Sequence, residues 1–318
     1  YRCPMNASGR TLTRLTVLGA LSASGMTAAL PVHADTSPEP SQKSAATELA
    51  ALHEAPWDQR GDFILSPSAS LEALSELPED APATQSWAEG GSRTGWFGDA
   101  WTDVDGAETP DGRRLSWRAN ATGPANLARE AIRHGLTLVH VSSEYTFDGT
   151  IEPHTEDEAP SPLGVYGQSK AGGDAAVEAV PEHYLVRTSW VVGDGGNFVR
   201  TMASLAGRGA APSVVADQTG RLTFTVDLAA GIIHLLSTGA EYGTYNLSGR
   251  GPVVSWCDIA RRVYELVGRS AAEVTPVTTA EYYAGQEGIA PRPLSSALDL
   301  SRIEATGFTP ADSMERLE

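Results

Sequence analysis

The feature of this 318-residue sequence that most constrains its fold is an apolar run between two helical patterns. Residues 136–141 are rich in apolar and β-branched side chains, as a strand buried on both faces of a parallel sheet must be. A helical pattern over 124–134 precedes this run, and an alanine-rich stretch, 171–179, follows it. The alternation predicts an α/β fold, a Rossmann-like doubly wound parallel sheet with a smaller C-terminal part.

The same alternation begins near the N-terminus, where the run Leu15–Leu18 predicts a strand. A G-x-x-S-x-x-G turn follows, formed by Gly19, Ser22 and Gly25, and a helix is expected to start directly after it. Glycines in such a turn let the backbone approach a pyrophosphate at the helix N-terminus. These three residues are therefore candidates for cofactor binding. Further patterns between 42 and 77 predict helix, strand and helix.

A second interpretation competes for residues 5–34. Two arginines, Arg10 and Arg14, precede a weakly apolar run, and small residues end it near Ala34, which is the outline of a secretory signal. No window approaches 18 uninterrupted apolar residues, so no membrane-spanning helix is expected.

The chemistry-bearing motif is Y-x-x-x-K, formed by Tyr166 and Lys170 at the start of the alanine-rich helix. Residues four apart share a helix face, which places the phenol beside the ammonium. A fixed cation there is expected to lower the tyrosine pKa, which suits proton transfer to or from a carbonyl or hydroxyl oxygen. A solvated helix face is the alternative interpretation of so short a motif.

Ser143 lies just beyond the 136–141 strand and precedes Tyr166 by 23 residues. Ligands of an open parallel sheet bind at the carboxyl ends of its strands, where a hydroxyl can donate a hydrogen bond to a substrate oxygen. The alternative is a serine that only caps a turn. The glycine turn, the buried strand, Ser143 and Y-x-x-x-K together favour a site that transfers a proton to or from a carbonyl or hydroxyl oxygen.

The composition limits the partners. Lys and Arg number 23 against 40 Asp and Glu, a net charge of −17, so nucleic acid and anionic membranes are not expected to bind. The two cysteines exclude a disulfide scaffold, and the histidine spacing gives no support for a zinc site, so no metal is predicted.

Residues 142–150 resemble the S-T-D-Y-V-F-D-G-T stretch of dTDP-4-dehydrorhamnose reductases, an extended branch of the short-chain dehydrogenase/reductases. The resemblance covers roughly residues 98–312 and is closest to the reductase half of proteins in which a 3,5-epimerase precedes the reductase. Further matching segments follow in chain order: 161–170, 186–193, 196–199, 217–220, 243–247, 292–293, 298–301 and 305–308.

The resemblance implies reduction of the 4-keto group of a dTDP-4-dehydro-6-deoxy sugar, dTDP-4-dehydrorhamnose above all, with NADPH or NADH as cofactor. The implied catalytic residues are Ser143, Tyr166 and Lys170. The latter two also contact the cofactor, together with the glycine turn, Ala100 and Thr102. The implied substrate-binding residues are Tyr145, Trp190, Asn197, Gln218 and Arg292. The alternative role of Trp190 is packing in the core. Arg187 is expected with Arg292 near the diphosphate, and its alternative role is a structural ion pair.

The expected organisation is an N-terminal tail over 1–14, a dinucleotide-binding domain over 15–190 and a mainly substrate-binding part over 191–318. Segments of this last part return to the Rossmann-like domain. An irregular stretch, 78–98, is expected as a surface excursion. The resemblance leaves open a homodimer or an association with a 3,5-epimerase.

Two departures from the family pattern concern the cofactor side: Ser22 replaces a glycine, and 78–98 stands where the fourth strand is expected. A nucleotide-sugar-binding protein with weak or lost turnover is therefore an alternative function. Removal of 1–34 would delete the first strand and its turn, and reduced nicotinamide is a cytoplasmic supply. We therefore expect a cytoplasmic protein, with a secreted, non-catalytic protein as the alternative.

Overall fold

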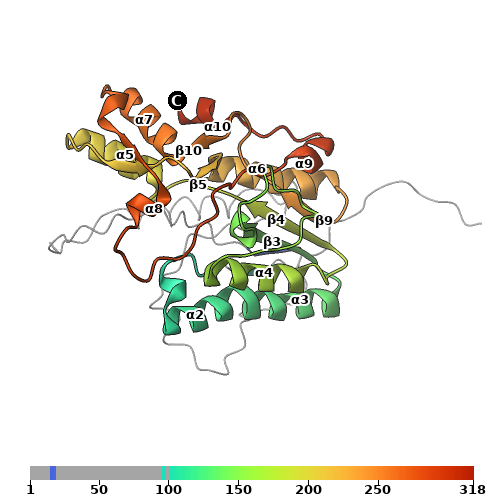
Figure 1. Cartoon of the computed structure of the whole chain (residues 1–318). Helices are drawn as coiled ribbons and strands as arrows, with labels where there is room; N and C mark the ends of the chain where they lie inside the picture. The colour runs from blue at the N-terminus through green and yellow to red at the C-terminus, as the bar shows by residue number, and fades with distance from the viewer. Residues whose placement is uncertain (1–14, 19–94, 98–99) are drawn as a thin grey trace, which may run out of the picture.

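The computed structural model describes residues 15–18, 95–97 and 100–318 (Figure 1). Its centre is a five-stranded sheet of order β2-β1-β3-β4-β9, and every neighbouring pair is parallel. The strands are β1 (Leu15–Leu18), β2 (Gly95–Phe97), β3 (Thr137–Ser143), β4 (His183–Thr188) and β9 (Gly243–Asn246). The predicted α/β class with a parallel sheet is confirmed.

Two strands lie in the part of the chain where the sequence was hardest to interpret. The predicted strand Leu15–Leu18 is confirmed as β1, between β2 and β3. Residues 95–97, assigned to an irregular stretch, instead form β2 and pair with β1. Pairing with β1 gives backbone groups of these three residues their hydrogen-bond partners. The glycine turn, the elements expected between 42 and 77 and the rest of 78–98 lie outside the described residues.

Helices α3 and α4 cover one face of the sheet, and α2 lies beside them (Figure 1). Leu138 of β3 and Leu185 of β4 pack there against Ala128 and Ala131 of α3 and Val177 of α4. The bounds are α2 (Pro110–Trp117), the π-helical turn η4 (Arg118–Thr122), α3 (Gly123–His134) and α4 (Val165–Val177). The predicted helices over 124–134 and 171–179 correspond to α3 and to the second half of α4.

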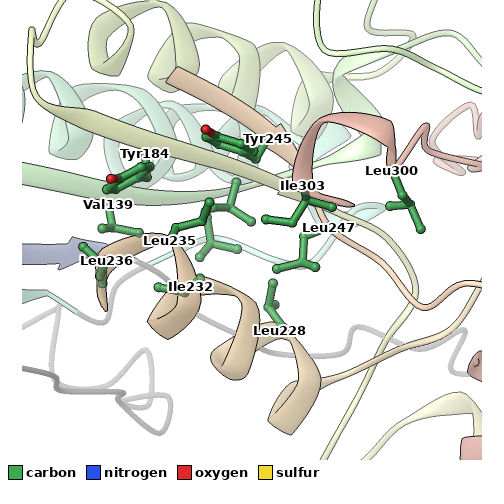
Figure 2. Packing of buried hydrophobic residues seen from close by; sticks show 12 residues of the cluster. Val139, Tyr184, Leu228, Ile232, Leu235, Leu236, Tyr245, Leu247, Leu300 and Ile303 are labelled. Atoms are coloured by element: carbon green, nitrogen blue, oxygen red, sulfur yellow. The ribbon is translucent and has the colours of Figure 1, made fainter. Parts of the chain in front are cut away.

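The other face is covered by α6 (Thr225–Thr238) and the short α9 (Ser301–Ala305). Figure 2 shows Val139 of β3 pointing to the same core as Leu235 and Ile232 of α6 and Ile303 of α9. Successive strand residues alternate between the two faces, so Leu138 and Val139 serve different cores. Because both faces are covered, the middle residues of β3 and β4 are apolar on both faces, namely Leu138, Val139, Leu185 and Val186.

A second core lies outside the large sheet. It is built around α5 (Phe198–Gly207) and α7 (Trp256–Leu266), with Met202, Leu222 and Ile259 buried in it. Three small strand pairs border it: β5 (Val191–Val192) with β8 (Thr223–Phe224), β6 (Ser213–Val215) with β11 (Thr275–Val277), and β7 (Thr219–Gly220) with β10 (Val254–Ser255). Between its segments the chain returns through α6 and β9 to the large sheet.

Residues 290–299, which we call the C-terminal strap, connect these two parts. The Ser296 N–H donates to Thr219 O at 2.7 Å, and the His154 N–H donates to Ala297 O at 2.8 Å. Short helices complete the described chain: η3 (Gly106–Glu108), η5 (Glu144–Thr146), η6 (Ala271–Glu273), α8 (Thr279–Tyr282) and α10 (Ser313–Leu317). Among the described helices, none has the length and apolarity needed to cross a membrane.

Candidate active site

Ser143 is the last residue of β3, at the carboxyl edge of the sheet. Its backbone is extended, and its Oγ accepts the Tyr145 N–H at 3.2 Å, which starts the tight turn η5. The same Oγ donates to Glu144 Oε2 at 2.8 Å and shares a hydrogen bond with the Tyr166 side chain. Ser143 therefore caps a turn and also contacts the predicted acid, so the two interpretations of this serine are compatible.

Tyr166 and Lys170 lie one turn apart at the start of α4, as the Y-x-x-x-K spacing predicts. A close approach fixes that start, because a Cβ on Gly167 would lie 2.1 Å from the Tyr145 carbonyl oxygen. Only glycine lets α4 pack this tightly on η5. The approach brings the Tyr145 and Tyr166 rings edge to face, with centroids 5.4 Å apart.

The pKa of Tyr166 does not shift in the direction expected from its sequence. Burial raises it well above the ordinary tyrosine value, the nearby Glu144 raises it further, and only the hydrogen bond with Ser143 opposes this. Lys170 is itself buried, donates from Nζ to Val141 O at 2.8 Å, and has a pKa lowered by burial to about 8. Loss of solvent around the phenol is the largest cause of the shift, so the phenol stays protonated at neutral pH.

Glu144 is an unusual member of this site because it is a carboxyl-bearing residue that is only 3% exposed. Burial raises its pKa to about 7, although hydrogen bonds with the Ser143 and Ser296 side chains act in the opposite direction. Ser296 belongs to the C-terminal strap. We call Ser143, Glu144, Tyr166 and Ser296 the hydroxyl cluster.

A second buried group lies behind Lys170. Asp174, one further turn along α4, lies 3.3 Å from Arg187 Nε and 3.6 Å from His140 Nε2, and Arg187 also approaches Glu178 at 3.5 Å. Burial alone would raise the pKa of Asp174, but His140, Arg187 and Lys170 together hold it below its ordinary value. We call His140, Asp174, Glu178 and Arg187 the ion-pair cluster. Arg187 therefore forms a structural ion pair, the alternative given for it above.

The predicted cofactor residues Ala100 and Thr102 flank Trp101, whose backbone is held on both sides by one amide. The Trp101 N–H donates to Asn120 Oδ1 at 3.0 Å, and Asn120 Nδ2 donates to Trp101 O at 3.0 Å. Asn120 Nδ2 also donates to Ser169 Oγ of α4 at 3.0 Å. The amide thus ties this segment to the helix of Tyr166 and Lys170.

Arg292 and Tyr145, both predicted to bind substrate, lie on neighbouring segments. Arg292 makes a two-pronged ion pair with Asp105, at 2.9 and 2.8 Å, and its guanidinium lies over the Tyr283 ring at 5.0 Å from the centroid. The charge of Arg292 lowers the pKa of Tyr145, which burial raises. Arg292 is therefore close enough to act on the site electrostatically.

Trp190 adopts a left-handed backbone conformation, with φ of 45°, which is strained for a bulky residue. Its indole stacks on Trp256 with centroids 3.8 Å apart. A Cβ on Gly220 would meet both this indole, at 2.9 Å, and Ser296 Cβ, at 3.1 Å. Trp190 thus packs on the second core and borders Ser296 of the hydroxyl cluster.

Asn197 and Gln218 are predicted to bind substrate and have partners within the protein. Asn197 is buried, caps α5 through the Arg200 N–H at 3.0 Å and donates to Gly193 O at 2.8 Å. Gln218 is buried and donates to Thr279 Oγ1 at 3.0 Å. The structure does not bring these two residues into contact with Ser143 or Tyr166.

Comparison with known proteins shows to which family this chain belongs. The family model of the RmlD substrate binding domain matches residues 98–317. A dTDP-4-dehydrorhamnose reductase of Mycobacterium tuberculosis is 39% identical over 219 residues, which are 66% of this chain and 70% of that protein. The chain belongs to the dTDP-4-dehydrorhamnose reductase family.

Other members of the family extend the comparison. A probable dTDP-4,6-dihydroxy-2-methyloxan-3-one 4-ketoreductase of Streptomyces antibioticus is 38% identical over 217 residues, covering 66% of this chain and 70% of that protein. The crystal structure of a dTDP-4-dehydrorhamnose reductase from Bacillus anthracis, in complex with NADP, is 36% identical with a TM-score of 0.63. That match covers 69% of this chain and 76% of the other. The suspected family is thereby confirmed.

The described residues of this reductase-family chain fit the nicotinamide end of such a cofactor. The hydrogen bond from Lys170 to Val141 uses one of the three ammonium protons, which leaves donors for ribose hydroxyls. Ser142 Oγ at the end of β3 and Thr188 Oγ1 at the end of β4 are buried without a hydrogen-bond partner among the described residues. The predicted pyrophosphate turn, Gly19 to Gly25, lies outside the described residues.

In the sequence, Glu144 falls within the 142–150 segment and Asp174 within the 171–179 stretch, neither with a predicted role, and Ser296 falls in no motif. A signal existed for Glu144, because it directly follows a buried strand and the predicted serine. For Asp174 the signal was its spacing, four residues after Lys170 on the same helix face. No local pattern could have indicated Ser296, which meets Glu144 only through the C-terminal strap. No group of three or more metal-ligating side chains that could hold a metal occurs among the described residues.

Proposed function

We propose that this chain is an NADPH- or NADH-dependent reductase of the 4-keto group of a dTDP-4-dehydro-6-deoxy sugar, converting dTDP-4-dehydrorhamnose to dTDP-rhamnose. The observation that carries the proposal is the convergence of Ser143, Tyr166 and Lys170 at the carboxyl edge of β3, with Ser143 and Tyr166 in hydrogen-bond contact. The family adds the substrate class. The relatives named above act on dTDP-linked sugars, and the Bacillus anthracis structure contains NADP.

Tyr166 is the proton donor in this proposal. A reduced nicotinamide, when bound, supplies the hydride that turns the ketone carbon into an alkoxide carbon. Burial keeps the phenol protonated before the reaction, and an alkoxide is more basic than a phenolate, so the proton moves to the new oxygen. Because its pKa is raised, Tyr166 acts as a general acid rather than as a general base.

Lys170 and Ser143 serve the same oxygen in different ways. Lys170, with a pKa of about 8, is charged at neutral pH and stabilises the phenolate that Tyr166 becomes. The Ser143 hydroxyl lies beside Tyr166 and can donate to the oxygen on which negative charge develops. Both groups are held by backbone contacts, Lys170 to Val141 O and Ser143 to the Tyr145 N–H, so little rearrangement is needed.

The substrate-binding assignments remain predictions: Tyr145, Trp190 and Arg292 beside the site, and Asn197 and Gln218 farther along the second core. Cofactor binding by Gly19, Ser22, Gly25, Ala100 and Thr102 is likewise proposed. So are the division at residue 190, the cytoplasmic location, and association as a homodimer or with a 3,5-epimerase.

The test measures the loss of reduced-nicotinamide absorbance in the purified chain with each ketone in turn. Turnover with dTDP-4-dehydrorhamnose and far less with free sugar ketones is expected, because binding of the remote nucleotide positions the carbonyl. Equal rates with and without the nucleotide would contradict the substrate. Binding of cofactor and dTDP-sugar without any turnover would show the alternative, a nucleotide-sugar-binding protein.

A further inference from the structure

Glu144 is a buried carboxyl whose partners are hydroxyls rather than cations. None of the ion pairs among the described residues includes it. Its side-chain partners are Ser143, at 2.8 Å, and Ser296. A carboxyl buried without a cation is costly to keep ionised, so such groups are frequent at functional sites. The reaction proposed above does not use it.

The hydrogen bonds of Ser143 can be counted. Its Oγ accepts from the Tyr145 N–H and shares a hydrogen bond with Tyr166, and its single proton is donated to Glu144. A serine hydroxyl has one proton and two lone pairs. In this arrangement no proton of Ser143 remains for a substrate oxygen, and the Tyr166 O–H is drawn to Ser143 as well.

We propose that Glu144 is a positioning residue that decides, by gaining or losing a proton, whether the Ser143 hydroxyl points to Glu144 or to the substrate oxygen. As a carboxylate, Glu144 accepts a hydrogen bond from the Ser143 hydroxyl, and the rate of reduction is lowered. As a carboxylic acid, Glu144 donates to Ser143 Oγ in place of the Tyr166 O–H, so the Ser143 and Tyr166 protons both turn toward the oxygen of the ketone. The proposal rests on the proposed reductase function and adds a control of the same site.

The groups that face Glu144 favour a change of protonation near neutral pH. They are Tyr145 on its own turn, Tyr166 from α4, and Ser296 from the strap, all without charge at that pH. Arg292, also on the strap, acts on Tyr145 and is paired with Asp105. Burial raises the pKa of Glu144 to about 7, so both forms are populated in the neutral range.

The expected result is a fall in kcat/KM as the pH rises. A single ionisation at about 7 reduces the protonated fraction about tenfold between pH 6 and pH 8. Lys170, with a pKa of about 8, loses about half its charge over the same interval, which contributes about twofold. The two contributions differ enough to be separated by substitution.

The experiment records kcat/KM for dTDP-4-dehydrorhamnose from pH 6 to pH 8 in wild type, Glu144→Gln and Glu156→Gln. Glutamine keeps the shape of Glu144 but does not titrate, so the fall is expected to shrink to about twofold. Glu156 is the matched control, since it is also a buried glutamate with a raised pKa, but it bonds the Asn246 N–H away from Ser143. Its variant should keep the full fall, and an undiminished fall in Glu144→Gln would overturn the proposal.

A second variant keeps Glu144 and covers the case in which Glu144→Gln does not fold. The Ser296 hydrogen bond lowers the pKa of Glu144, so Ser296→Ala should move the midpoint of the profile to higher pH. A midpoint that stays or moves down would refute the control by Glu144. Absence of turnover by wild type at every pH would refute the reductase function itself, whereas turnover without these shifts refutes only the role of Glu144.

Discussion

Helix α4 borders two buried groups that contain a carboxylate in similar surroundings but with opposite behaviour. Asp174 in the ion-pair cluster is 1% exposed and has a lowered pKa, whereas Glu144 in the hydroxyl cluster is 3% exposed and has a raised one. Burial acts in the same direction on both. The difference lies in the partners, because Asp174 faces Arg187 and Lys170, while Glu144 faces hydroxyls. The neighbouring cations keep Asp174 ionised, so it serves in an ion pair. Glu144 has no cation beside it in the described part of the chain, so its protonation changes near neutral pH.

The largest effect on turnover is expected from removing the phenol of Tyr166, the proton donor in the hydroxyl cluster. Tyr166→Phe keeps the ring and its edge-to-face contact with Tyr145 but has no phenol. Turnover should fall by about two to four orders of magnitude, as for loss of a general acid. The unfolding free energy should fall by only about 1 kcal/mol, the contribution of one hydrogen bond. Unchanged turnover in a folded variant would exclude Tyr166 as the acid.

The ion-pair cluster should respond in stability instead. Asp174→Asn leaves the Arg187 guanidinium buried without its nearest carboxylate, which is expected to cost about 3–5 kcal/mol of unfolding free energy. Urea denaturation followed by circular dichroism measures this loss. A loss below about 1 kcal/mol would show that Asp174 does not compensate the buried charge.

The pH dependence of stability distinguishes the two carboxylates directly. Between the ordinary value of 4.5 and about 7, the folded protein holds a proton on Glu144 that the unfolded chain has released. Stability from this group is therefore complete below pH 4.5 and is lost as the pH rises through 7. Glu144→Gln lacks this titration, so its unfolding free energy relative to wild type should increase by up to about 3 kcal/mol between pH 4.5 and pH 8. Parallel stability curves for the two proteins would contradict the raised pKa.

The smallest change in unfolding free energy is expected for Glu178, the exposed carboxylate of the ion-pair cluster. Glu178 approaches the same guanidinium as Asp174, but its side chain is 47% exposed. Glu178→Gln should therefore change the unfolding free energy by about 1 kcal/mol or less, because water screens an exposed ion pair. Measured beside Asp174→Asn, it serves as the matched control. Equal losses in the two variants would mean that exposure does not set the strength of these pairs.

Elements with a clear local sequence pattern could be predicted from the sequence alone. The run over 136–141 indicated β3 because both of its faces are buried, and Tyr166 with Lys170 needed only helical spacing. Residues 95–97 were missed because three residues among glycines give no periodicity, and pairing with β1 decides their structure. The pKa of Tyr166 was predicted in the wrong direction because its burial depends on η5 packing over α4, which the motif does not contain.

The strap described above has a consequence for the order of folding. Ser296, which completes the surroundings of Glu144, is held against Thr219, and its neighbour Ala297 against His154, so the contacts span long stretches of sequence. Contacts of high sequence separation form late, because the intervening chain must first lose its entropy. During synthesis, β3 and α4 leave the ribosome well before residue 296 and can pair without it. We therefore expect Tyr166 and Lys170 to come together on α4 before Ser296 completes the surroundings of Glu144.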